Sequence, residues 1–146
     1  MISIRRRAGP RLAKVAWLLL TVPLIAGCSQ RILSATQNFT DVSAQEAFDL
    51  IQTNANNPDF ILLDVRTPEE YSEGHLANAV LIDFRADNFK LEIDKLTKDK
   101  TYLVYCRTGN RSRGTLDIMA ELGFENVYHL TAGITGWREA GLPVTK

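Results

Sequence analysis

The chain has 146 residues, with 17 basic and 17 acidic side chains, and therefore no formal net charge. Five of the basic residues and none of the acidic ones lie in residues 1–27, so the remainder has 12 basic and 17 acidic residues and a net charge of −5. The length of this remainder suits a single domain. Its acidic charge and the absence of a basic run argue against nucleic-acid binding.

The first 27 residues have the features of a secretion signal. A basic start precedes an apolar run at residues 15–24, which is shorter than the roughly 20 residues that a membrane-spanning helix needs. Residues 25–28, Ile-Ala-Gly-Cys, resemble the bacterial lipobox, in which the cysteine becomes the lipidated first residue of the mature protein. This resemblance implies a lipoprotein signal peptide at 1–27, lipidation of Cys28, and contact with a membrane through the lipid anchor alone. An ordinary secretory signal and an uncleaved anchor are the alternatives.

The lipobox also implies an extracytoplasmic location. Ser29, rather than an aspartate, follows the cysteine, which favours the outer membrane facing the periplasm if the source is Gram-negative. Residues 28–38 show no sustained hydrophobic period and are interpreted as a lipidated tether. Residues 39–146 are then left for one folded domain.

The domain begins with a helix and a buried strand. Ser43 and Glu46 have the spacing of a capping box, and apolar residues at helical spacing follow between 44 and 51. Residues 60–65 form a continuous apolar run that ends in Asp-Val, which is typical of a strand buried on both faces of a parallel sheet.

The rest of the domain alternates between strand and helix patterns. Thr67 and Pro68 provide an N-cap and a first-turn proline, so a short helix is expected to begin there and to end at Gly74. The next helix is expected to have Leu91 on its apolar face. The further strands are predicted at 79–82, 101–105 and 127–130, and the further helices at 89–96, 112–122 and 134–140. This alternation predicts an α/β fold with a mostly parallel sheet covered by helices on both faces.

The loop after the strand at 101–105 has the features of an active site, because ligands of parallel sheets collect where a strand's carboxyl end meets the next helix. Gly109 allows a positive φ, so successive N–H groups can point into one concavity backed by the helix N-terminus. With two arginines beside it, the Cys106 sulfur is expected to be held as an anion, with a pKa well below the free value of about 8.5. The loop reads Cys106-Arg107-Thr108-Gly109-Asn110-Arg111-Ser112.

Three blocks of the sequence resemble the rhodanese family. They are residues 63–66 with 70–71, 74–76 and 78–79, the loop 106–112, and residues 132–137 with 140–144. Ala132 departs from the pattern, since a first glycine is commoner there. The resemblance covers nearly the whole domain and implies a rhodanese-like α/β fold, with a central, mostly parallel sheet of about five strands and helices on both faces.

The resemblance implies a thiosulfate sulfurtransferase that uses no cofactor. Cys106 would take the outer sulfur from a small anion such as thiosulfate, hold it as a persulfide, and pass it to a thiol, to cyanide or to an acceptor protein. Arg107 and Arg111 are candidates for the donor's sulfonate oxygens, although Arg111 could instead pair with a carboxylate such as Glu70. The expected anion-binding residues are Arg107, Thr108, Gly109, Asn110, Arg111 and Ser112.

Two other functions remain open. A cysteine phosphatase or arsenate reductase uses a similar loop, but it has five residues between the cysteine and the arginine, whereas four separate Cys106 from Arg111. A non-catalytic binding or persulfide-carrier module would keep the fold without turnover, and such modules usually lack the cysteine.

Polar side chains outside the loop are interpreted as structural. Asp64 and Arg66 stand at the end of a buried strand and are expected to form an ion pair near the site, with a catalytic role as the alternative. His75 and His129 have no Cys or carboxylate at ligand spacing, so no metal site is expected.

Overall fold

The structure is a computed structural model that describes residues 37–146. The expected signal peptide, the lipidation site at Cys28 and the tether as far as residue 36 lie outside the described residues. Within the described part of the chain, no helix is long and apolar enough to cross a membrane.

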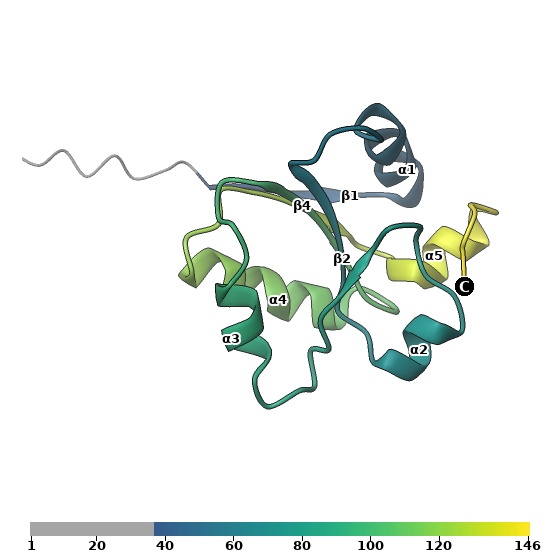
Figure 1. Cartoon of the computed structure of the whole chain (residues 1–146). Helices are drawn as coiled ribbons and strands as arrows, with labels where there is room; N and C mark the ends of the chain where they lie inside the picture. The colour runs from purple at the N-terminus through teal and green to yellow at the C-terminus, as the bar shows by residue number, and fades with distance from the viewer. Residues whose placement is uncertain (1–36) are drawn as a thin grey trace, which may run out of the picture. The chain divides into compact units, whose positions relative to one another are not determined.

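Five parallel strands form one sheet in the order β1-β5-β4-β2-β3 (Figure 1). The central strand β4 lies between β5 and β2, and it leads directly into the loop that contains Cys106. The strands are β1 (Asn38–Val42), β2 (Phe60–Asp64), β3 (Val80–Leu81), β4 (Thr101–Tyr105) and β5 (Asn126–Leu130).

Helices cover both faces of this sheet (Figure 1). One face has a buried cluster that includes Leu103, Leu130 and Trp137 and the contacts between α1 and α5. The other face has a cluster that includes Val104 and Met119 and the contacts between α3 and α4. This arrangement confirms the predicted α/β fold. The helices are α1 (Ala44–Thr53), α2 (Pro68–Ser72), α3 (Phe89–Asp94), α4 (Asn110–Glu121) and α5 (Gly133–Glu139).

Capping boxes set the start of α1 and α2. The Ser43 hydroxyl accepts from the Glu46 N–H, and the Glu46 carboxylate accepts from the Ser43 N–H. Thr67 and Glu70 make the same reciprocal pair at the start of α2. Each box provides acceptors for two N–H groups at the helix N-terminus, where N–H groups have no carbonyl partner within the helix. The cap at Thr67 therefore turns the chain into α2 directly after β2 and places Glu70 beside the site.

Two elements differ from the sequence-based expectations. Residues 38–42 form the edge strand β1, which the sequence did not predict because most of its residues are exposed and show no apolar alternation. Asn38, the last residue of the expected tether, is the first residue of this strand. Leu91 is 66% exposed, so its expected place on the apolar face is wrong. The short helix α3 instead buries Phe89 and Ile93.

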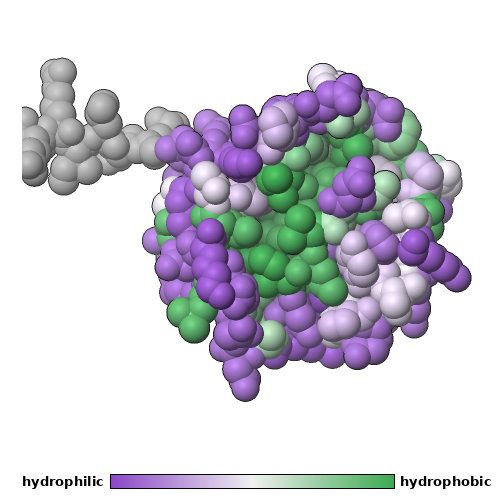
Figure 2. Space-filling model, viewed as in Figure 1, coloured by the Kyte–Doolittle hydropathy of each residue, from purple (hydrophilic) through white to green (hydrophobic). Residues whose placement is uncertain are grey.

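The opposite edge of the sheet exposes apolar side chains. The strand β3 has two residues and pairs with Leu63 and Asp64 of β2. Ile61, Val80 and Leu96 contribute to a groove of about 230 Å³ along this edge, and Figure 2 shows apolar side chains gathered in the middle of this view. Because β3 is so short, it pairs only with the C-terminal end of β2. The N-terminal end of β2, which is the end away from the Cys106 loop, has no strand from the described residues beside it on this edge.

Candidate active site

Cys106 is the first residue after β4, and the loop that follows it ends in the N-terminus of α4. Gly109 is the N-cap residue of α4 and has a φ of 95°, as expected for a loop that curls around a sulfur. A Cβ at this position would collide with the carbonyl oxygen of Thr131, so the close approach of the two backbones also requires glycine. The loop is therefore packed tightly against the end of β5.

The Cys106 sulfur lies inside this loop. It accepts a hydrogen bond from the Gly109 N–H at 3.2 Å and contacts the Ser112 hydroxyl at 3.4 Å. Burial, which leaves the residue 1% exposed, raises the pKa of the thiol. The Ser112 hydroxyl and the amides of Ser112, Thr108 and Gly109 more than offset this effect, so the pKa falls below its ordinary value. The sulfur is buried, but the surrounding peptide hydrogens point at it.

The start of α5 supports the loop from behind. The N–H of Ile134 donates to the Cys106 carbonyl at 2.9 Å, and the N–H of Thr135 donates to the Arg107 carbonyl at 3.0 Å. Gly133 approaches these two carbonyls so closely that a side chain there would collide with them. These contacts satisfy N–H groups of the first turn of α5. They use only carbonyl groups of the loop, so the loop amides stay free to face the sulfur.

Arg111 is bound to a carboxylate of a neighbouring helix. Its guanidinium makes two hydrogen bonds to Glu70, of 2.7 and 2.8 Å, which is the alternative contact that the sequence left open. The Arg111 hydrogen bonds outweigh partial burial and hold the pKa of Glu70 at about 2. This ion pair joins the first turn of α4 to α2.

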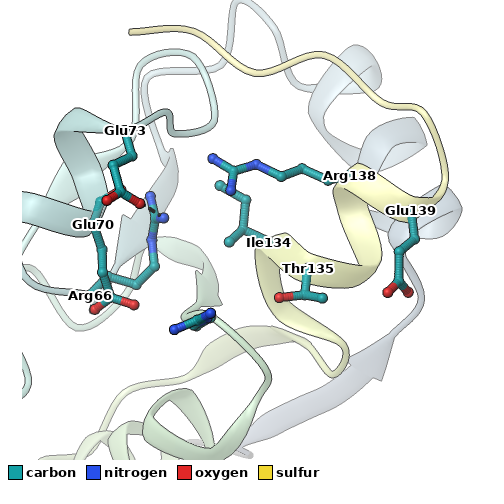
Figure 3. A pocket seen from close by; sticks show the side chains of 8 residues that line it. Arg66, Glu70, Glu73, Ile134, Thr135, Arg138 and Glu139 are labelled. Carbon is teal, nitrogen blue, oxygen red and sulfur yellow. Dashed lines mark hydrogen bonds between the residues drawn. The ribbon is translucent and has the colours of Figure 1, made fainter.

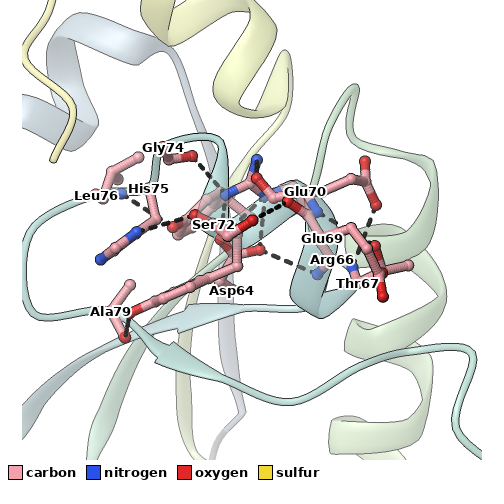
Figure 4. Close-up of polar contacts among 12 residues, drawn as sticks. Asp64, Arg66, Thr67, Glu69, Glu70, Ser72, Gly74, His75, Leu76 and Ala79 are labelled. Atoms are coloured by element: carbon pink, nitrogen blue, oxygen red, sulfur yellow. Dashed lines mark hydrogen bonds and ion pairs between the residues drawn. The ribbon is translucent and has the colours of Figure 1, made fainter. Parts of the chain in front are cut away.

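Asp64 and Arg66 form a buried ion pair at the end of β2 (Figure 4). Their side chains are 0% and 3% exposed, and the Arg66 Nη2 lies 2.7 Å from the Asp64 carboxylate. Arg66 also donates to the carbonyls of Glu70 and Gly74, at 3.0 and 2.9 Å. The pair therefore fixes the backbone around α2, and neither residue contacts the Cys106 sulfur.

A cavity of about 440 Å³ opens beside the loop, between α2 and α5 (Figure 3). Arg107, whose side chain is exposed, lines it together with Arg66 and Arg138. Arg138 donates to the Gly74 carbonyl at 3.3 Å, the same oxygen that accepts from Arg66. Arg66 is committed to Asp64 and to two backbone carbonyls, so Arg107 and Arg138 are the guanidiniums of this cavity that can donate to an oxyanion. The other lining residues are Glu70, Glu73, Ile134, Thr135 and Glu139.

The side chains of Thr108 and Asn110 are exposed and take no part in the contacts to the sulfur. The sequence also missed one feature, a chain of contacts behind Ser112. The Ser112 hydroxyl lies 2.9 Å from Nε2 of His129, and Nδ1 of His129 lies 2.9 Å from Asp41. Within residues 37–146, no group of three His, Cys, Asp or Glu side chains is arranged to hold a metal ion.

Known proteins are similar to this chain in sequence and in fold. The family model of the rhodanese-like domain matches residues 43–140. The thiosulfate sulfurtransferase GlpE of Actinobacillus succinogenes is 34% identical over 112 residues, which cover 73% of this chain and 90% of that protein. A sulfurtransferase of Allochromatium vinosum is 29% identical over 103 residues, which cover 70% of this chain and 94% of that protein.

Solved structures agree with this relationship. The rhodanese-related protein of Thermoplasma volcanium superimposes with a TM-score of 0.60 and 32% identity, over 73% of this chain and 97% of the other. The matched region contains the Cys106 loop and all of the helices that support it. The chain therefore belongs to the family of rhodanese-like domains, and its homologues include sulfurtransferases.

Proposed function

We propose that this protein is a thiosulfate sulfurtransferase that carries a sulfane sulfur on Cys106 as a persulfide. The observation that carries the proposal is the position of the Cys106 sulfur, at the end of a parallel strand and within reach of the Gly109 amide and the Ser112 hydroxyl. These donors stabilise a thiolate at Sγ, which is the nucleophile that takes up the sulfane sulfur. The names of the homologues support the same substrate class.

The reaction divides into two displacements on sulfur. The Cys106 thiolate attacks the outer sulfur of the donor, the donor's sulfur–sulfur bond breaks, and sulfite leaves with the bonding electrons. An acceptor such as cyanide or a thiolate then attacks the outer sulfur of the persulfide, and Cys106 leaves again as a thiolate. The buried position of Cys106, 1% exposed, favours a donor that presents a single narrow terminal sulfur atom to the thiolate.

Arg107 is the residue that we assign to the sulfonate of the donor. Arg111 is occupied by Glu70, whereas Arg107 lines the cavity beside the loop with an exposed side chain. A guanidinium there offers paired donors to the sulfonate oxygens while the outer sulfur points toward Cys106. The occupied Arg111 also argues against a phosphatase, in which the loop arginine binds the phosphoryl group.

Steady-state assays test the proposal. The purified protein should transfer sulfur from thiosulfate to cyanide or a thiol, the variant Cys106→Ser should not, and a phosphate ester should remain intact with both proteins. Turnover of the phosphate ester without turnover of thiosulfate would reverse the assignment. Partner capture without turnover by several donors would favour the binding module.

We also propose that the protein acts from a membrane, through a lipid on Cys28. The support is the basic start, the apolar run and the lipobox-like residues 25–28. Metabolic labelling with a fatty acid tests this proposal in the source cells or a bacterial host. The wild type should incorporate the label and sediment with membranes, and Cys28→Ala should do neither. An unlabelled wild type would contradict lipidation.

A further inference from the structure

A second set of polar groups, none of which lines the cavity, leads to the Cys106 sulfur. The Ser112 hydroxyl contacts Sγ at 3.4 Å and Nε2 of His129 at 2.9 Å, and it also lies 2.9 Å from the Gly109 carbonyl. Nδ1 of His129 lies 2.9 Å from the Asp41 carboxylate. Asp41, His129 and Ser112 thus form a continuous line of hydrogen-bonding groups, which we call the relay, from the surface to the sulfur.

His129 is buried, so only the groups packed against its ring can exchange a proton with it. Its side chain is 2% exposed, and its neighbours in the sheet register are Asp41 on β1 and Val104 on β4. The charged groups that face it are Asp41 and, through Asp41, Arg113 of α4, whose guanidinium binds the other carboxylate oxygen at 2.7 Å. The Arg113 hydrogen bond, followed by that of His129, holds the pKa of Asp41 below its usual range. Asp41 therefore stays ionised and fixes a hydrogen on Nδ1.

The hydrogens in this line can be arranged in two ways. Ser112 has one hydroxyl hydrogen and two lone pairs, and a neutral imidazole has one donor and one acceptor nitrogen. With His129 neutral, Nε2 accepts the Ser112 hydrogen, and the Ser112 oxygen can accept the S–H of Cys106. With His129 protonated, Nε2–H donates to the Ser112 oxygen or to the Gly109 carbonyl, which lies 3.3 Å away. The Ser112 hydrogen is then free to point at a Cys106 thiolate.

We infer that His129 is a positioning residue that stores the proton of Cys106, through Ser112, while the sulfur is a thiolate. The S–H bond of Cys106 breaks, the Ser112 oxygen takes up that proton, and the hydroxyl's own proton moves to Nε2. No electron is transferred, and the products are a thiolate and an imidazolium. When Cys106 leaves the persulfide as a thiolate, the reverse movement returns the proton. The role of the thiolate rests on the proposed function, but the proton movement itself does not require sulfur transfer.

The pH dependence of Cys106 alkylation tests the relay. Iodoacetamide reacts with the thiolate, and peptide mass spectrometry separates Cys106 from Cys28. The variant His129→Asn should react about tenfold more slowly at neutral pH, with its profile moved to higher pH, because it has no imidazole to take up the Cys106 proton through Ser112. The matched control is His75→Asn, since His75 contacts the Tyr71 carbonyl and ring instead of the loop. Superimposable profiles for wild type and His129→Asn would overturn the relay.

A measurement that leaves His129 in place covers the case in which His129→Asn does not fold. Nitrogen NMR of the His129 ring reports its protonated fraction in the wild type and in Cys106→Ala. The relay requires the fraction at neutral pH to fall when the sulfur is removed, and an unchanged fraction would contradict it. A protein that shows this coupling but forms no persulfide would refute the proposed function and leave the relay standing.

Discussion

Glu70 and Arg111 are 41 residues apart in the sequence, and they form two hydrogen bonds of 2.7 and 2.8 Å between α2 and α4. Both side chains are mostly buried, with 22% and 16% exposed. The pair holds the Cys106 loop at the end where α4 begins, and the N-terminus of α5 contacts the other end of the same loop. An arginine that the sequence offered as a substrate ligand is thus part of the support of the loop.

Replacing Glu70 with glutamine should make stability less sensitive to acid. The pKa of Glu70 is lowered from 4.5 to about 2, so its stabilising effect is present above pH 4.5 and is lost as the pH falls toward 2. We expect Glu70→Gln to lower the free energy of unfolding by about 1 kcal/mol at neutral pH, since the pair is partly exposed to solvent. Urea titrations at several pH values measure this difference. A difference that stays constant down to pH 2 would contradict the ion pair.

The buried pair at the end of β2 should matter far more than a pair on the surface. The variant Asp64→Asn leaves the Arg66 guanidinium buried without its counter-charge, and we expect a loss of about 3 kcal/mol in the free energy of unfolding. The control is Glu121→Gln, because Glu121 pairs with Lys90 where both side chains are more than half exposed. That variant should lose less than about 0.5 kcal/mol. Equal losses of unfolding free energy for Asp64→Asn and Glu121→Gln, measured by urea denaturation, would show that burial does not determine how much an ion pair contributes to stability.

Gly109 should tolerate a methyl group much less well than Gly141. Both have a positive φ, of 95° and 71°, so alanine is strained at either position by about 1 kcal/mol. A Cβ at Gly109 also collides with the Thr131 carbonyl, whereas a Cβ at Gly141 meets no atom within 4 Å. We expect Gly109→Ala to be the less stable variant in thermal unfolding and to lose sulfur transfer. Full activity in Gly109→Ala would contradict the described packing of the loop.

The fold was predictable from the sequence because its signals are local. The capping residues Ser43 and Thr67 and the apolar runs of β2 and β4 identify their elements without any tertiary information. The strand β1 was missed because its residues are mostly exposed, and only its pairing with β5 makes it a strand.

The part of the candidate site that depends on local sequence was also predictable. The strand–loop–helix pattern around Cys106 is local, and it indicated the cradle of amides. The contact between Ser112 and His129 cannot be read from local sequence, because it depends on the register of β5 and on how α4 packs over that strand. A histidine at that position and an acidic residue in β1 would have been a signal only if β1 had been recognised.

Arg107 should affect the binding of the donor more than its turnover. The variant Arg107→Gln removes one exposed guanidinium from the cavity, and we expect KM for thiosulfate to rise about tenfold with a smaller change in kcat, which corresponds to one charged hydrogen bond. Arg85→Gln serves as the control, because Arg85 is exposed and is not part of the cavity. An unchanged KM in Arg107→Gln would move the sulfonate site elsewhere.

The central claim is that Cys106 accepts and holds one sulfur atom, and mass spectrometry of the intact protein after thiosulfate treatment tests it most directly. The account predicts a gain of one sulfur, located on Cys106 by peptide analysis, removed by cyanide, and absent from Cys106→Ser. A wild-type protein that gains no sulfur from thiosulfate or from related donors, while its Cys106 remains alkylatable, would contradict the claim.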